Sequence, residues 1–347
     1  MKPIKEPVLY EDLTYHVSNR VLILDGNSVL HRAYYALPDW RNRSGEATAG
    51  VYGFLSMLVK ALDEIKPTHL AIVFDHPGPS FRHLMYVGYQ TNREKDRQIF
   101  EDIYGQIDKL KIIFEKVGTP VFQVEGFEAD DVIGTIGSQA QGLKDTEIII
   151  ITGDRDLMQL VNDKVNLYMP IKGMSDMQII DRDKVKDRLG VYPEQVIDYK
   201  ALVGDSSDNY PGVQGIGPKT AVELIEKFGS FENIYTTLDS TATQYPHSLK
   251  GFSPYVGGDE RGGIVVGGGK GGGISESIIK KLTNGYESGE LSKRLATIKL
   301  DVPVTFNSAK CQVPSAKEIT DVLLELGYKN LVKRIKTNED SLSPRLF

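Results

Sequence analysis

Four short apolar runs, each followed along the chain by acidic residues, constrain the fold of this 347-residue sequence more than any other feature. Runs of this length and composition are typical of strands that are buried on both faces of a sheet. Helical patterns separate the runs, and strands that alternate with helices favour right-handed crossovers between parallel neighbours. The sequence therefore predicts an α/β domain whose mostly parallel central sheet is flanked by helices. The four runs are Val21 to Leu24, Leu70 to Phe74, Val121 to Val124 and Ile148 to Ile151.

Seven carboxylates follow these runs. Ligands of open α/β sheets bind outside the carboxyl ends of the strands, so we expect the seven side chains to gather at one edge of the sheet. The helix dipole by itself would explain an acidic first helical turn around Asp130. The repeated placement of acids after strands favours a shared site instead. The seven residues are Asp25, Asp75, Glu128, Asp130, Asp131, Asp154 and Asp156.

Asp205 and Asp208 add a further pair at a spacing of three, which brings the predicted set to nine carboxylates. No histidine joins them, and an all-oxygen site suits Mg²⁺ or Mn²⁺ rather than zinc. Cys311 is the only cysteine, so neither an intrachain disulfide nor a thiolate metal site is available. The number of acids indicates two ions. Paired hard cations about 4 Å apart are suited to phosphodiester hydrolysis.

A glycine-rich turn follows this pair and leads to Pro218, which opens a helix. Bare backbone amides in such a turn, a helix N-terminus and a lysine all attract a phosphodiester. An ordinary connection between helices would explain the turn if it stood alone. Beside nine predicted metal ligands it indicates a helix-hairpin-helix that holds the DNA backbone. The predicted DNA-binding residues of the hairpin are Gly212, Val213, Gly215, Ile216, Gly217, Lys219 and Thr220.

The stretch from His76 to Arg97 is polar and too irregular for a simple turn. Long loops inside compact domains tend to be functional. This one mixes basic residues with tyrosines. Such a mixture suits the binding of single-stranded nucleic acid, because the cations contact its phosphates and its bases stack on the aromatic rings. We therefore predict that Tyr89 and Lys95 bind DNA, and a solvated surface loop explains the same composition equally well.

Six motifs in order give the chain a close resemblance to the 5′-nuclease family. That family includes flap endonucleases and the N-terminal 5′-3′ exonuclease domain of bacterial DNA polymerase I, and the resemblance covers roughly Arg20 to Ile335 apart from one insert. The motifs are Leu24-Asp25-Gly26-Asn27-Ser28, Phe74-Asp75, Phe81-Arg82-His83, Glu128-Ala129-Asp130-Asp131, Thr152-Gly153-Asp154-Arg155-Asp156 and Gly204-Asp205-Ser206-Ser207-Asp208-Asn209.

The resemblance implies a PIN-like 5′-nuclease fold with a helical arch at about 76–106 and a helix-hairpin-helix region. It implies a metal-dependent 5′-3′ exonuclease or structure-specific flap endonuclease of replication and repair, with a potassium ion at the hairpin. The expected partner is 5′-flap, nicked or branched DNA, and a DNA polymerase in cis or in trans is a further expected partner of a monomer. The catalytic residues it implies are Asp25, Asp75, Arg82, Gln90 and Arg93.

Gln90 departs from the family, which usually has a lysine after the tyrosine of the arch motif. A weakened nuclease that chiefly binds branched DNA is therefore an alternative, and Arg93 or Lys95 could supply the missing cation. An acid-rich phosphatase or a PIN-type ribonuclease would explain the acids but not the hairpin. Complete retention of the carboxylates argues for an active nuclease, because uncompensated carboxylates cost stability and do nothing for DNA affinity.

We expect five segments along the chain. They are an N-terminal extension (1–19), the nuclease domain (20–180), a helical DNA-binding domain (181–335), a disordered insert within it (251–273) and a tail (336–347). Eleven of the 23 residues of the insert are glycine, a composition typical of a flexible, disordered loop.

The net charge of −6 usually argues against DNA binding, but the nine acids assigned to metal account for it. The charged N-terminus lacks an apolar signal core, so we expect a cytoplasmic protein without a membrane span.

Overall fold

The computed structural model describes residues 18–92, 97–173, 176–244 and 274–333. The chain divides into two compact units, whose ranges are Met1–Ser80, Lys95–Asp181 and Ile298–Phe347 for the first and Phe81–Glu94 and Arg182–Thr297 for the second. The predicted arch at 76–106 is therefore shared between the units. The predicted insert, most of the N-terminal extension and the tail lie outside the described residues.

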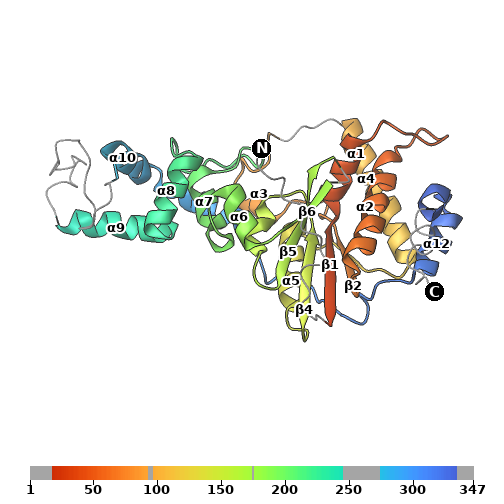
Figure 1. The fold of residues 1–347 in the computed structure, drawn as a ribbon. Coiled ribbons are helices and arrows are strands. Elements are labelled where there is room, and N and C mark those ends of the chain that lie inside the picture. Colours follow the sequence, from red (N-terminus) through yellow and green to blue (C-terminus); the bar gives the residue numbers. More distant parts are fainter. Residues whose placement is uncertain (1–17, 93–96, 174–175, 245–273, 334–347) are drawn as a thin grey trace, which may run out of the picture. The chain divides into compact units, whose positions relative to one another are not determined.

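One sheet forms the centre of the first unit, with the strand order β3-β2-β1-β4-β5-β6 (Figure 1). β1 pairs in parallel with both β2 and β4, and only β6 runs antiparallel to its neighbour β5. The sequence analysis missed β6 because its side chains are mostly exposed and give no apolar run. The predicted α/β class with a mostly parallel sheet is confirmed. The strands are β1 Asn19–Asp25, β2 His69–Val73, β3 Val121–Phe122, β4 Thr146–Ile151, β5 Val165–Lys172 and β6 Asp176–Ile180.

Helices cover both faces of this sheet because successive side chains of a buried strand point to opposite sides. Leu22 and Leu24 belong to a core shared with α1 (Gly26–Ala36), α2 (Ala49–Ile65) and α4 (Arg97–Lys116). Val21 and Ile23 are also fully buried. On the opposite face, α5 (Ala129–Ala140) packs against β1, β2 and β4. This sandwich explains why the strands read as continuous apolar runs rather than as alternating ones.

The C-terminal segment from Ile298 packs with the first unit, which differs from the predicted helical domain 181–335. The backbone N–H of Leu70 donates to the carbonyl oxygen of Cys311 at 2.6 Å, beside the edge of the sheet. Further along, α12 (Ala316–Glu325) places Leu323 in the core formed with α2 and α4. The chain thus returns to the first unit after building the second, a long-range connection that local periodicity does not reveal.

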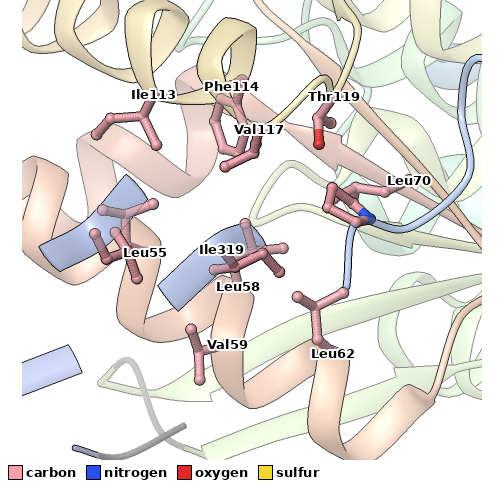
Figure 2. A pocket seen from close by; sticks show the side chains of 12 residues that line it. Leu55, Leu58, Val59, Leu62, Leu70, Ile113, Phe114, Val117, Thr119 and Ile319 are labelled. Carbon is pink, nitrogen blue, oxygen red and sulfur yellow. The ribbon is translucent and has the colours of Figure 1, made fainter. Parts of the chain in front are cut away.

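A small apolar pocket of about 20 Å³ lies where α2, α4 and α12 meet. Figure 2 shows Leu55, Leu58, Phe114 and Ile319 turned toward this space from the three helices. Drug-sized ligands need several hundred Å³, whereas this space is comparable to that occupied by one water molecule. The pocket is therefore a packing defect in the core and not a binding site.

The second unit is built from short helices. The helix α7 packs against α8 and α11, and α10 packs against α11. Within the four described ranges, no helix is long and apolar enough to span a membrane. The elements are α3 Phe81–Met85, α6 Arg182–Leu189, η3 Pro193–Gln195, α7 Val196–Val203, α8 Pro218–Phe228, α9 Phe231–Gln244, α10 Glu276–Asn284 and α11 Tyr286–Ala296, and the first unit also contains the 3₁₀ helix η2 Asp156–Leu160.

Leu323→Ala is expected to lower the free energy of unfolding by about 2 to 5 kcal/mol, because it leaves a cavity in a core that α12 completes. Leu324→Ala on the same helix is the control, since this side chain is 43% exposed and its loss should change stability by less than about 0.5 kcal/mol. Urea denaturation followed by circular dichroism measures both. Equal, small effects of the two changes would mean that α12 does not belong to the core.

Candidate active site

The carboxyl edge of the sheet collects the seven predicted acids of the first unit. Asp25 ends β1, the central strand, from which neighbours extend in both directions. Asp75 follows β2, Asp154 and Asp156 follow β4, and α5 brings its acidic N-terminus to the same edge. The chain adds β2 and β3 on one side of β1 and β4 and β5 on the other. Ligands of open α/β sheets bind outside the carboxyl ends of the strands at such a point, where the strand order changes direction. The fold thus places all seven residues at the carboxyl edge of the sheet.

Asp25 holds several parts of this edge together, and its side chain is only 3% exposed. One carboxylate oxygen accepts the Ser28 backbone N–H at 3.0 Å and so caps α1. The other accepts the Thr152 hydroxyl at 2.7 Å, and the same hydroxyl oxygen accepts the Asp154 backbone N–H at 2.9 Å. The ends of β1 and β4 are therefore fixed to each other through polar side chains.

The N-terminus of α5 is held to the end of β2 in a similar way. The Ala129 backbone N–H donates to Oδ1 of Asp75 at 2.7 Å, and the Ser80 hydroxyl donates to Oε1 of Glu128 at 2.6 Å. A carboxylate is favourable there because the first amides of a helix lack intrahelical partners. Asp75 and Glu128 thus lie at the expected edge.

Asp131 is fully buried and serves the architecture of this region. One of its oxygens accepts the Glu128 backbone N–H at 3.2 Å, and the other accepts the Lys299 backbone N–H at 2.8 Å. Both oxygens thus bind amides of the fold. This geometry favours a structural role for Asp131 over the metal ligation that the sequence analysis predicted.

The acids at this edge disturb one another electrostatically. Burial raises the pKa of Asp25 to about 7, and the charges of Asp154 and Asp75 contribute to the rise. Burial raises the pKa of Asp130 well above its ordinary value, with contributions from Asp154, Asp25, Asp156 and Asp75. Perturbed carboxylates of one sign in a small region cost stability, and they are typical of functional sites. A cation bound between them would lower that cost.

The donor set fits a hard divalent cation, because it consists of carboxylate oxygens. As they stand, however, no three His, Cys, Asp or Glu side chains in the described part of the chain lie close enough together to enclose a metal ion. Asp25, Asp75 and Glu128 instead direct oxygens to the hydrogen bonds given above. Some of the carboxylates must therefore turn before they can share a cation.

Asp205 and Asp208 lie in the second unit, on the loop after α7. Asp205 pairs with Lys200, whose side chain is only 12% exposed, and one Asp205 oxygen accepts the Ser207 backbone N–H at 2.7 Å. Although burial opposes ionisation, Lys200 and Ser207 keep the pKa of Asp205 below its ordinary value. Asp205 is therefore ionised and shapes its own loop. That these two acids share a site with the seven of the first unit stays a prediction.

The ring of Tyr89, a residue predicted to bind DNA, is only 3% exposed. It packs in a small cluster with Tyr210 and Leu295, and its hydroxyl group donates to Oδ2 of Asp208 at 3.2 Å. Gln90 follows, and its side-chain amide donates to Oδ1 of Asp208 at 3.1 Å. Both side chains thus bind a carboxylate of their own unit, and the predicted roles of Tyr89 and Gln90 stay predictions.

Arg82 was predicted to act in catalysis, and that role stays a prediction. Its side chain is 3% exposed and donates to the carbonyl oxygens of Leu295 at 2.8 Å and Thr297 at 3.0 Å. These carbonyls lie at the end of α11, so Arg82 caps that helix from inside the second unit. Arg93 and Lys95 lie outside the described residues, and their predicted roles stay predictions.

The hairpin forms where the backbones at Gly204 and Gly212 touch. A Cβ atom on Gly212 would lie 2.2 Å from the Gly204 nitrogen, and both residues have positive φ angles, so only glycine fits this contact. Val213 and Ile216 are 2% and 5% exposed. Their side chains pack inside the unit, so only their backbone amides could meet a phosphate, and their part in DNA binding stays a prediction.

Of the predicted DNA-binding residues of the hairpin, Gly215, Gly217 and Lys219 are exposed and Thr220 is half-buried. Gly217 is the N-cap of α8 and offers no side-chain cap, and Pro218 occupies the first turn as predicted. The first amides of this helix therefore lack intrahelical partners, and they belong to an exposed and a half-buried residue, Lys219 and Thr220. Gly212 is buried, and its N–H donates to the Ser292 hydroxyl at 2.9 Å. Fewer of the predicted hairpin residues are therefore accessible to a DNA phosphate than the sequence analysis expected.

Four positioning residues escaped the sequence analysis, although the motifs contain three of them. Thr152 and Ser28 hold Asp25, Asn27 accepts the Asp75 backbone N–H at 2.8 Å, and Lys200 pairs with Asp205. Hydroxyl and amide side chains within one to three residues of a predicted acid are the signal that could have found the first three. Lys200 has no such signal, because it reaches Asp205 across a helix end.

Profiles of two protein families match the chain. The family described as "5′-3′ exonuclease, N-terminal resolvase-like domain" matches residues 20–190, and "5′-3′ exonuclease, C-terminal SAM fold" matches residues 191–318. Curated relatives include DNA polymerase I of Caldicellulosiruptor bescii, 34% identical over 92% of this chain and 34% of that protein. DNA polymerase I of Bacillus subtilis is 33% identical over 93% of this chain and 32% of that protein. The chain thus spans about a third of the length of these relatives.

Two solved structures share the fold. A complex of the bacteriophage T5 flap endonuclease with DNA and metal ions has a TM-score of 0.57 at 20% identity, covering 92% of this chain and 98% of that one. The catalytic core of Rad2 in complex with DNA substrate has a TM-score of 0.53 at 16% identity, covering 91% and 92%.

Asp25→Asn is expected to stabilise the protein in the presence of a chelator at pH 8 by on the order of 1 to 3 kcal/mol. The pKa of Asp25 in the folded protein, about 7, lies above its ordinary value of 3.8. Ionisation therefore weakens the fold progressively as the pH rises from about 4 to 7, and the full penalty persists above pH 7. Asparagine carries no charge and still caps α1.

Melting temperatures measured from pH 4 to 8 in chelator test this expectation, with Asp163→Asn at an exposed acid as the control. The gain of Asp25→Asn should shrink toward pH 4, because the wild-type carboxyl is then protonated in the folded protein and the pH is close to its ordinary pKa of 3.8. A variant less stable than the wild type at pH 8 would show that no electrostatic strain resides at Asp25.

Proposed function

Because this chain belongs to the 5′-3′ exonuclease family, we propose that it hydrolyses DNA phosphodiesters as a 5′-3′ exonuclease and structure-specific flap endonuclease. The observation that carries the proposal is the gathering of mutually perturbed carboxylates at the carboxyl edge of the sheet. Such a site suits phosphoryl chemistry with hard cations. Removal of primers or flaps during replication and repair is the corresponding cellular role.

Divalent metal ions are part of this proposal, since a T5 flap endonuclease structure is described with DNA and metal ions. Bound divalent cations supply Lewis acidity toward the scissile phosphate and lower the pKa of a coordinated water. Two Mg²⁺ or Mn²⁺ ions suit the number of acids, and a potassium ion at the hairpin belongs to the same proposal. The residues that would hold the divalent ions are Asp25, Asp75, Glu128, Asp130, Asp154 and Asp156 in the first unit and Asp205 and Asp208 in the second.

The chain's own residues keep the acids ready for this chemistry. Thr152 and Ser28 hold the Asp25 carboxylate at the end of β1, and the first amide of α5 holds Asp75. The first amides of α8, together with Lys219, would bind a duplex phosphate. Binding the duplex at the hairpin would orient the substrate, because a fixed backbone position sets where the 5′ strand is presented.

A pure DNA-binding role is not favoured. The carboxylates at the sheet edge raise the free energy of the fold and repel phosphates, so a protein selected only for binding gains nothing from them. The expected partner is 5′-flap, nicked or branched DNA. A monomeric state, a DNA polymerase as a partner in cis or in trans and a cytoplasmic location complete the proposal.

Asp154→Ala is expected to lower DNA cleavage by roughly 10²-fold or more, because Asp154 lies at the centre of the perturbed group of acids. The measurement uses 5′-labelled flap, nicked and single-stranded DNA and a matched RNA, each with Mg²⁺ or with chelator. The wild type should cut flap or nicked DNA only with Mg²⁺. The variant should keep its DNA affinity in chelator, and Asp163→Ala serves as the charge-matched control. Equal cleavage by Asp154→Ala and the control would remove Asp154 from the site.

Lys219→Ala is expected to weaken duplex binding to a similar extent for all sequences. The slope of log affinity against log salt should become shallower by about one unit, because one phosphate contact is lost. Lys227→Ala removes the same charge from the last turn of the same helix and should leave the slope unchanged. Fluorescence anisotropy in chelator from low to high salt gives both slopes, and identical slopes for the two variants would place the duplex elsewhere.

A further inference from the structure

The helix α10 brings Lys281 to the hairpin of the second unit. The ammonium group of this lysine donates to the carbonyl oxygen of Gly215 at 3.0 Å, although the two residues lie 66 positions apart along the chain. The lysine stem lies across the same glycine, since a Cβ atom on Gly215 would lie 3.0 Å from Cε and 3.2 Å from Cδ of Lys281. Gly215 has a φ of 83°, a conformation that favours glycine. The absence of a side chain at residue 215 therefore leaves room for the lysine.

The packing of α10 and α11 on the hairpin fixes this placement. Leu282, the residue after the lysine, is fully buried. A Cβ atom on Gly285, between the two helices, would lie 2.7 Å from Cγ1 of Val213, so the helix junction contacts the hairpin directly. In the first turn of α11, the Ser288 hydroxyl donates to the Gly212 carbonyl oxygen at 2.7 Å. The two helices thus hold the backbone of the hairpin at more than one point.

The ammonium group of Lys281 keeps its positive charge at the surface. Within the four described ranges, the only polar contact of this side chain is the Gly215 carbonyl oxygen, a neutral acceptor that does not cancel the charge. A lysine ammonium has three N–H donors, so two remain beyond this bond. Lys281, Gln214 and Gly215 are all exposed. The structure therefore presents a fixed cation with unused donors at the exposed turn of the hairpin.

A fixed cation is well suited to bind a phosphate. A lysine that is mobile before binding loses rotamer freedom when it contacts its ligand, and a lysine that is already held in place loses less. Lys219, the lysine predicted to bind DNA, is exposed at the start of α8 and makes no polar side-chain contact with the described residues. Of these two lysines, Lys281 is therefore the one that the fold positions in advance.

We propose that Lys281 is a DNA-binding residue, whose ammonium group, held at the Gly215 carbonyl, contacts a second duplex phosphate beside the one bound at the start of α8. This inference rests on the proposed function, because it adds a contact to the same hairpin. It assigns part of the duplex affinity to a helix outside the hairpin sequence. A potassium ion at the hairpin would bind carbonyl oxygens other than that of Gly215, because the ammonium there repels a second cation.

Binding of duplex DNA by the full chain in chelator, followed by fluorescence anisotropy from low to high salt, tests the proposal. Lys281→Met removes the charge and keeps an unbranched stem. It should lower the affinity by about 5- to 10-fold near 0.1 M salt and make the slope of log affinity against log salt shallower by about 0.9. The loss should be similar for duplexes of different sequence, because phosphate contacts carry no sequence information.

The neighbouring Lys280 supplies a matched control. Lys280→Met removes the same charge from an exposed residue that lies about 100° around α10 from Lys281, and it should leave the slope unchanged. Lys281→Gln keeps a side-chain N–H donor without the charge, so it should show the same shallower slope as Lys281→Met. In the double variant of Lys219→Ala and Lys281→Met the two changes in slope should add, because the lysines contact separate phosphates.

The outcomes distinguish this inference from the function on which it rests. Unchanged slopes for both Lys219→Ala and Lys281→Met would overturn it together with duplex binding at the hairpin. A shallower slope for Lys219→Ala, with equal slopes for Lys281→Met and Lys280→Met, would overturn only the role of Lys281. Weaker binding by Lys281→Met at an unchanged slope would also overturn that role, because the lysine would then only support the turn. A wild type without Mg²⁺-dependent cleavage would overturn the nuclease proposal, whereas the slopes would still decide the role of Lys281.

Discussion

The rest of the structure depends on the cost of placing like-charged carboxylates together at the edge of a buried sheet. Asp25 is almost fully buried, and its pKa rises to about 7 under the influence of burial and of Asp154 and Asp75. The burial of apolar strand side chains on both faces of the sheet stabilises the fold and offsets the electrostatic cost of these carboxylates. Helix N-termini and hydroxyl groups fix the carboxylates where they repel one another, which only the binding of cations would make favourable.

In the second unit, backbone and polar contacts position the hairpin and the loop that carries Asp205 and Asp208. Its hairpin depends on two glycines whose backbones touch, and the helix α8 that follows begins without a side-chain cap. Its acidic loop is held by Lys200, which pairs with Asp205, and by Tyr89 and Gln90, which donate to Asp208. Polar contacts therefore position both the predicted DNA-binding surface and the second pair of acids, while the buried residues around Tyr210 and Leu295 support them.

The membership in the 5′-3′ exonuclease family confirms what six short motifs indicated, because those motifs carry the residues that the chemistry needs at fixed points of the fold. Arg82 and Tyr89 stand among the predicted functional residues, yet both are buried and bind groups of their own unit. A residue type at a motif position does not reveal whether its polar atoms face solvent or the protein.

The sequence by itself determined the parallel sheet, the placement of acids after its strands and the proline that opens α8, because these features depend on neighbours within a few residues. Only the tertiary structure decided which acids perturb one another, that Asp131 binds backbone amides and that the segment after Ile298 returns to the first unit. It also decided that Gln90 reaches Asp208, 118 positions away along the chain. Such pairings arise when packing brings distant segments together, and local periodicity and spacing carry no record of them.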